Sequence, residues 1–211
     1  MVHGYHVILA AYGFWLPNDP RGSWSDFVGK WELARFGQAT HSQDRRGLEQ
    51  LTADELQRRD AARKTLKYPA VQFTGLQARA IGRGFAKAVQ RSGYSIWACA
   101  ILPEHTHLVI ARHGFKVENI ANLLKGDATR AVSTESLHPL AQYAAPGERP
   151  PRMWAEHQWK VFLDSEEAIE NAITYVNDNP TKEGRPAQNW PFVVPFRGLD
   201  LDKGWMTYGS D

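Results

Sequence analysis

Two histidines separated by a single residue carry the clearest chemical signal in this chain. His105 and His107 stand at the start of a β-branched, apolar run. In a strand, residues i and i+2 point to the same face, roughly 6.6 Å apart along the chain. Both imidazoles can therefore bind one metal ion, while Thr106, Leu108 and Ile110 face the other way into a core. Taken alone, the pattern is equally typical of two polar residues on an exposed strand face.

A tyrosine and an asparagine form the second pattern, near the end of a predicted amphipathic helix. Asp164 is a candidate N-cap for this helix, and Pro180 is expected to end it, since the residue before a proline is pushed out of helical conformation. Tyr175 and Asn179 are four residues apart, so they share one helix face and offer a phenolic hydroxyl beside an amide oxygen. Without the histidines, a core tyrosine followed by an ordinary Asn-Pro stop is the better interpretation.

Together the two patterns resemble the single-tyrosine transposases of the HUH superfamily, especially their REP-associated tyrosine transposase branch. The segment from Pro103 to Val109 is similar to that family's Pro-acidic-His-hydrophobic-His-Leu pattern, and Tyr175 to Pro180 is similar to its nucleophile helix. Segments 5–9, 12–17 and 153–162 also look like the family, so the resemblance covers about residues 1–16 and 70–196. Two departures are Thr106, where the family usually has an aliphatic residue, and Asn179, where some relatives have glutamine.

The resemblance implies an α+β, ferredoxin-like (RRM-like) HUH fold, with an antiparallel central sheet, helices on one face and a catalytic tyrosine helix. It implies that Tyr175 is the nucleophile and that His105, His107 and Asn179 bind Mg²⁺ or Mn²⁺. The implied activity is cleavage and rejoining of single-stranded or hairpin DNA through a 5′-phosphotyrosine. Because one nucleophile makes one covalent bond at a time, two-ended transposition slightly favours a homodimer.

Two alternatives keep the same fold and a different activity. One is an HUH nicking enzyme of the replication-initiator or relaxase type, but the chain shows no helicase region and its Tyr-x-x-x-Asn-Pro pattern favours a transposase. The other is a domesticated nucleic-acid-binding module without cleavage. The presence of all four candidate residues, His105, His107, Tyr175 and Asn179, argues against lost activity.

Length and composition fit a single folded domain. The chain has 211 residues, of which 43% are apolar, and this composition lies outside the disordered range. We expect one domain over residues 1–196, with an insertion at about 13–69 and a C-terminal tail at 197–211. No apolar run approaches the ~20 residues needed to span a bilayer, so a cytoplasmic location without membrane contact is expected. Cys99, the single cysteine, lies in an apolar run and is expected to be a buried, inert thiol.

The hydrophobic pattern predicts the order strand, helix, two strands, helix, strand, followed by the tyrosine helix. The predicted ranges are 5–11, 74–92, 94–102, 105–112, 116–134 and 159–163. Inside the insertion, Thr52 and Glu55 predict a capping box that opens a charged helix through about Leu66.

Basic residues cluster on two of the predicted helices. The candidates for DNA contact are Arg58, Arg63 and Lys64 in the insertion, and Arg83, Lys87 and Arg91 in the helix 74–92. A solvated helix face is the default interpretation of such a pattern. If the chain carries a transposase-like site, a surface that follows DNA becomes the better interpretation of these basic residues. The net charge of +2 permits nucleic-acid binding but does not indicate it.

Overall fold

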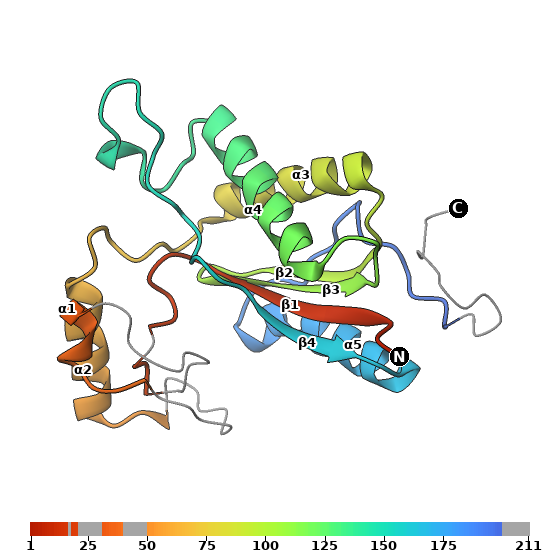
Figure 1. The fold of residues 1–211 in the computed structure, drawn as a ribbon, viewed down its shortest axis with the longest axis horizontal. Helices are drawn as coiled ribbons and strands as arrows, with labels where there is room; N and C mark the ends of the chain where they lie inside the picture. Colours follow the sequence, from red (N-terminus) through yellow and green to blue (C-terminus); the bar gives the residue numbers. More distant parts are fainter. Residues whose placement is uncertain (17, 21–30, 40–49, 200–211) are drawn as a thin grey trace.

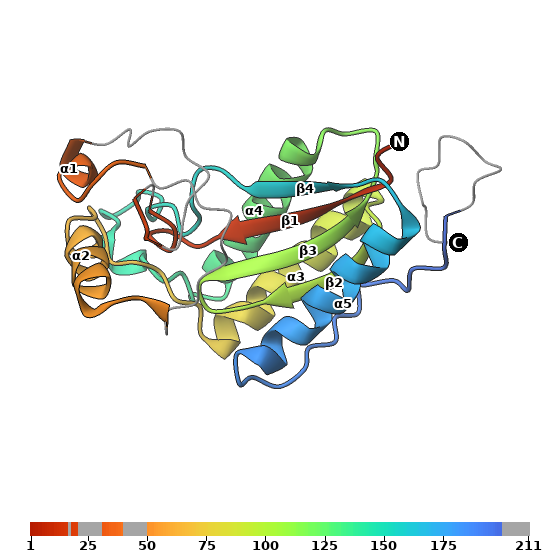
Figure 2. The same ribbon diagram turned by 90° about the horizontal axis from the view of Figure 1, so that it is seen from below.

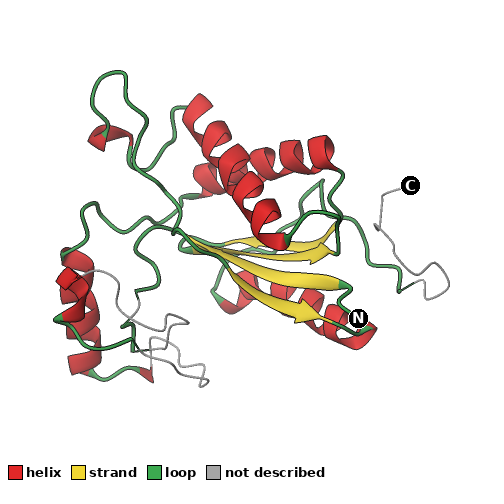
Figure 3. Ribbon diagram, in the orientation of Figure 1, coloured by secondary structure: helices red, strands yellow, loops and turns green. Residues whose placement is uncertain are grey.

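The computed structural model describes residues 1–16, 18–20, 31–39 and 50–199. Residue 17, much of the predicted insertion and residues 200–211 of the predicted tail lie outside the described residues. Within them, an antiparallel sheet is flanked by helices on both faces (Figures 1 and 3). No helix in the part of the chain that the structure describes is long and apolar enough to cross a membrane.

The sheet has four strands in the order β2-β3-β1-β4, with every neighbouring pair antiparallel. The strands are β1 (Gly4–Ala10), β2 (Ile96–Ile101), β3 (His105–Ala111) and β4 (Trp159–Leu163). Strand β1 lies between β3 and β4. The strand that carries His105 and His107 and the strand that leads into the tyrosine helix therefore both pair with β1. With the helices between them, these strands confirm the predicted ferredoxin-like order.

Helices cover the two faces of the sheet differently. The long helices α3 (Gly75–Ser92) and α4 (Val117–Thr134) pack together on one face, and α5 (Glu166–Lys182) lies on the other (Figure 2). A Cβ on Gly84 would lie 2.5 Å from the Cα of Ala128, so only glycine permits α3 to approach α4 this closely. Tyr175, which lies in α5, is thus on the face of the sheet opposite α3 and α4.

Alternation along the strands divides the apolar residues between two cores. Val7 and Leu9 of β1, with Leu108 and Ile110 of β3, face α3 and α4 and are fully buried. Residues of β2 and β3 on the opposite face pack against Ile169 and Val176 of α5. Cys99 is buried as expected, and burial raises the pKa of its thiol well above its usual value.

Local signals account for several helix ends. Thr74 accepts a hydrogen bond from the Gln77 backbone in a full capping box at the start of α3, and Gly93 ends that helix with φ 66°. The predicted capping box of Thr52 and Glu55 is present as well, and α2 runs over Ala53–Lys64. A short helix α1 (Trp31–Ala34), which the sequence pattern did not predict, also lies in the insertion.

Two expectations about the tyrosine helix are wrong. Its N-cap is Ser165, not Asp164, because the Ser165 side chain accepts from the Ala168 backbone N–H. Pro180 lies inside α5 and does not end it. A proline in the last turn removes only one backbone donor, and the helix continues to Lys182, where the N–H of Glu183 donates to the Asn179 carbonyl.

The described part of the insertion has a small apolar cluster of its own. Leu16, Leu33 and Ala62 are buried together, with Phe36 and Leu66 packed against them. The cluster joins α1 and α2 in a lobe beyond one end of the sheet (Figure 1). A short 3₁₀ helix, Ala141–Tyr143, lies in the long connection between α4 and β4.

Candidate active site

Strand alternation places both motif histidines on the sheet face that α5 covers. Thr106 and Leu108 are fully buried on the opposite face, as the sequence predicts. The rings of His105 and His107 have centroids 4.7 Å apart and planes at 80°. His107 is 3% exposed and His105 is partly buried, so the pair lies at the margin between core and solvent.

Tyr175 lies directly against His107. Its ring centroid is 5.6 Å from that of His107, with the planes at 82°, so the two rings meet edge to face. Tyr175 is partly buried in α5, one side of which packs on the apolar residues of β2 and β3. Two motifs that are 68 residues apart in sequence, from His107 to Tyr175, thus form one cluster.

Asn179 extends the cluster by one helix turn. It is 8% exposed, and its Nδ2 atom is buried without a hydrogen-bond partner among the described residues. Four residues of helix advance about 6 Å, close to the spacing of two strand residues. The C-terminal end of α5, which carries Asn179, lies near the end of the sheet where β3 begins (Figure 2).

The donor set fits a divalent cation. A buried amide that lacks a partner is costly unless something binds it, and the assignment of its oxygen and nitrogen can be exchanged. Two imidazoles with one amide oxygen leave positions open for substrate and water. In the described residues no group of three or more His, Cys, Asp or Glu side chains is arranged to hold a metal, so the amide of Asn179 would have to complete the set.

His6 belongs to the cluster, although the sequence pattern did not identify it as a site residue. Its Nε2 lies 3.0 Å from Nδ1 of His107, and both rings are buried. The signal was present in β1, where His6 alternates with the core residues Val7 and Leu9 and so shares the face of the paired histidines. A lone histidine in a strand did not reveal which side chains it would meet.

Lys182 is the second residue that sequence reasoning missed. Its Nζ lies 5.6 Å from the centroid of the Tyr175 ring and 3.5 Å from Oδ2 of Asp178. Lys182 falls inside α5 only because the helix continues past Pro180. The continuation of α5 past Pro180 therefore brings the Lys182 ammonium close to the Tyr175 ring.

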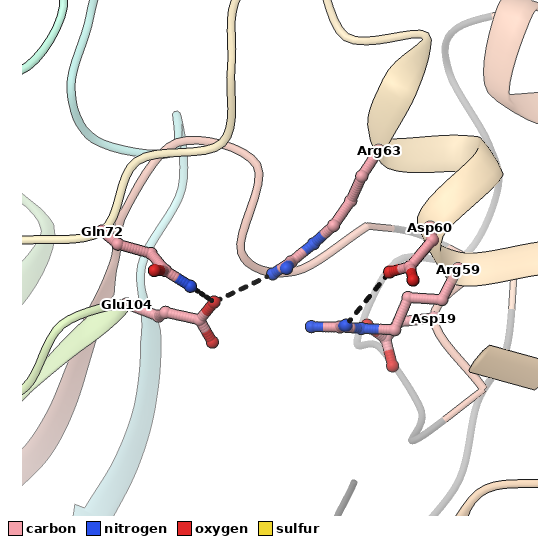
Figure 4. A network of polar contacts seen from close by, with 6 residues as sticks. All are labelled: Asp19, Arg59, Asp60, Arg63, Gln72 and Glu104. Atoms are coloured by element: carbon pink, nitrogen blue, oxygen red, sulfur yellow. Dashed lines mark hydrogen bonds and ion pairs between the residues drawn. The ribbon is translucent and has the colours of Figure 1, made fainter. Parts of the chain in front are cut away.

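Side chains of the insertion and of the segment before α3 meet the turn that precedes His105. Nη2 of Arg63 and Nε2 of Gln72 both donate to Oε1 of Glu104, at 3.2 and 2.9 Å (Figure 4). The Glu104 carbonyl accepts from the Ala11 backbone N–H at 2.8 Å. Deeper in the lobe, Nε of Arg59 donates to Asp19 at 3.3 Å, and both side chains are buried. Arg63, a candidate for DNA contact, thus holds the residue next to a candidate metal ligand.

The other basic candidates lie on two surfaces. Arg58 and Lys64 are exposed on α2, in the lobe of the insertion. Arg83, Lys87 and Arg91 belong to α3, which covers the opposite face of the sheet. Arg83 pairs with Glu135, and Nη2 of Arg91 lies 2.6 Å from the buried carboxylate of Asp127. The structure brings none of the α3 residues to the tyrosine.

Comparison with protein-family models gave no match, and comparison with curated proteins gave none. Two solved structures are similar in fold. One is a REP-associated tyrosine transposase bound to a REP hairpin, at 13% identity and TM-score 0.46, with 90% of this chain and 74% of that chain covered. The other is a protein from Deinococcus radiodurans R1 assigned as a transposase, at 13% identity and TM-score 0.36, with 89% and 94% covered. At these values, neither similarity transfers an activity to this chain.

Proposed function

We propose that this chain is a metal-dependent, single-tyrosine transposase of the HUH type. The observation that carries the proposal is the edge-to-face contact of Tyr175 with His107, one helix turn from the buried amide of Asn179. A nucleophile, two imidazoles and an amide thus share one sheet face, as the resemblance in sequence implies.

The chemistry needs charge neutralisation and an activated oxygen, because the anionic oxygens of a phosphodiester repel nucleophiles. His105, His107 and Asn179 would hold Mg²⁺ or Mn²⁺, and the bound ion supplies positive charge to the phosphate oxygens. Imidazole ligands favour Mn²⁺ over the harder Mg²⁺ in such a mixed set.

Tyr175 supplies the attacking oxygen. Its phenolic oxygen forms a bond to phosphorus while the bond from phosphorus to the 3′-oxygen breaks, and the leaving 3′-oxygen takes up a proton to become a hydroxyl. The product is a 5′-phosphotyrosine, which a 3′-hydroxyl from another strand can attack in the reverse sense. A free phenol has a pKa of about 10, so the attacking oxygen must lose its proton with assistance. The ammonium of Lys182 beside the ring favours the negative charge that develops there.

The proposed substrate is single-stranded or hairpin DNA, since one tyrosine cuts one strand. The exposed cations of α2 suit contacts with phosphates of the DNA backbone. A homodimer would supply two nucleophiles for two element ends.

Strand-specific labelling tests the nucleophile. Single-stranded and hairpin oligonucleotides drawn from the genomic flanks of the coding region are labelled at the 5′ or the 3′ end and incubated with protein and Mn²⁺. A 5′-phosphotyrosine retains the 3′ label on the protein in a denaturing gel and releases the 5′ label. Tyr175→Phe should bind DNA and form no adduct, while Tyr143→Phe, which changes a tyrosine exposed by 43%, should react normally. An adduct with Tyr175→Phe would refute the assignment.

Removal of the ligands tests the metal. His105→Ala, His107→Ala and chelation of the wild type should each abolish the adduct while DNA binding persists. Full cleavage in excess chelator would show that the histidines have another role.

A further inference from the structure

His6 lies at the centre of the packing around the candidate site, but the proposed reaction gives it no role. Its ring is 8% exposed and has neighbours on three sides. The centroid distances are 5.2 Å to His107, 5.7 Å to Tyr175 and 6.0 Å to Trp159. A side chain that touches both a candidate ligand and the candidate nucleophile can fix the position of each.

The hydrogen bond between His6 and His107 has two neutral forms. A neutral imidazole carries its proton on one nitrogen and accepts at the other. If Nε2 of His6 donates, His107 accepts at Nδ1 and keeps its proton on Nε2, where no lone pair is left for a metal. If Nδ1 of His107 donates, its Nε2 lone pair is available. The 3.0 Å distance fits both forms, but only the second is compatible with metal binding.

We propose that His6 is a positioning residue that accepts a hydrogen bond from Nδ1–H of His107 and so directs Nε2 of His107 to the metal ion. This inference rests on the proposed function. Ligand histidines in metalloproteins usually donate their second ring N–H to a carboxylate, a carbonyl or a water, which fixes the tautomer and the ring orientation. Here an imidazole from the neighbouring strand takes that place.

The strand pairing makes the arrangement rigid. His6 pairs with Val109 across the β1–β3 ladder, and Ile8 pairs with His107, so the two histidines are diagonal neighbours on one face. The side chains of Trp159 on β4 and Tyr175 on α5 pack against the other sides of the His6 ring. His6 therefore has little freedom to leave its partner, and the acceptor is in place before a metal binds.

The tautomers can be observed directly. In the full chain with ¹⁵N-labelled histidine and saturating Mg²⁺, long-range ¹H–¹⁵N spectra should show His107 protonated at Nδ1 and not at Nε2, and His6 also protonated at Nδ1. A proton on Nε2 of His107 would overturn the inference. This measurement uses the wild type, so it decides the question even if a variant fails to fold.

Metal titration gives a second readout that does not depend on cleavage. Mn²⁺ alone is titrated into the full chain and followed by electron paramagnetic resonance. His6→Leu removes the acceptor and should weaken Mn²⁺ binding by about 10- to 100-fold. His6→Gln places an amide oxygen near the position of Nε2 and should bind Mn²⁺ almost as well as the wild type. His157→Gln, which changes an exposed histidine, controls for the loss of any imidazole.

The same titration separates failure of the inference from failure of the proposed function. If His105→Ala and His107→Ala keep wild-type Mn²⁺ affinity, the proposed metal centre is wrong and the role of His6 falls with it. If those variants lose Mn²⁺ while His6→Leu retains it, the centre stands and only the inference is overturned. An equal loss in folded His6→Leu and His6→Gln would also contradict an acceptor role.

Discussion

The ring of Phe14 stacks face to face on the ring of His105, with centroids 4.9 Å apart and planes at 7°. Phe14 is 7% exposed and stands at the start of the predicted insertion. The Phe14 ring covers one face of the His105 imidazole and limits its rotation about χ2. The nitrogens at the edge of the imidazole remain able to bind a metal ion. The insertion therefore contributes directly to the geometry of a candidate ligand.

Exchange of Phe14 for leucine tests this contact. Phe14→Leu keeps most of the buried apolar volume, so the free energy of unfolding should fall by only about 1 kcal/mol. The Mn²⁺ affinity should fall by about tenfold, because the His105 ring becomes free to rotate. Denaturant titration and Mn²⁺ titration measure the two effects. Phe115→Leu, which changes a residue exposed by 49% near α4, is the control, and an unchanged Mn²⁺ affinity of Phe14→Leu would contradict the prediction.

The two basic surfaces should differ in their contribution to DNA binding. For single-stranded DNA, removal of one cation that binds a phosphate should flatten the dependence of log affinity on log salt by about 0.7. Arg58→Gln combined with Lys64→Gln on α2 should therefore flatten the slope by about 1.4. The matched pair Arg83→Gln and Lys87→Gln on α3 should change it little, because α3 covers the face opposite the site. Binding titrations at several salt concentrations measure the slopes, and an unchanged slope for the α2 pair would leave α2 an ordinary solvated helix.

Removal of the charge beside the nucleophile should slow adduct formation. Lys182→Met keeps the aliphatic stem and removes the ammonium near the Tyr175 ring. We expect the rate of adduct formation to fall by about tenfold, equivalent to ~1.4 kcal/mol in the barrier. Single-turnover assays with labelled hairpins measure the rate. Lys87→Met on α3 should react at the wild-type rate, and an equal rate for Lys182→Met would mean that its charge does not assist the tyrosine.

Lys125 should make stability depend on pH. Its Nζ donates to the backbone oxygens of Ala155, Glu156 and His157, in the segment that leads into β4, and burial lowers the pKa of Lys125 from 10.5 to about 8. Between these two pH values the unfolded chain binds more protons than the folded one, so stability rises with pH. Relative to Lys125→Met, the wild type should gain stability across this window, by at most about 1.4 kcal/mol per pH unit. Denaturation of both proteins below, within and above the window measures the difference, and a constant difference would contradict the shift.

The sequence by itself determined the order of elements and the faces of the motif residues. Period-two alternation fixed that His105 and His107 share a face opposite Thr106 and Leu108, since neighbouring strand residues point in opposite directions. Helix periodicity placed Tyr175 beside Asn179 in the same way, and the capping box of Thr52 and Glu55 fixed the start of α2. These features are local, so they can be read without knowing the fold.

The tertiary structure decided which residues meet across the chain. His6 and His107 are 101 residues apart, and only the central position of β1 brings their rings together. Arg63 and Arg91 were candidates for DNA contact because both are basic, but they pair with Glu104 and Asp127, which lie 41 and 36 residues away. The partner of a side chain depends on strand order and helix packing. Local periodicity specifies the face on which a residue lies, and only the assembled sheet specifies what faces it.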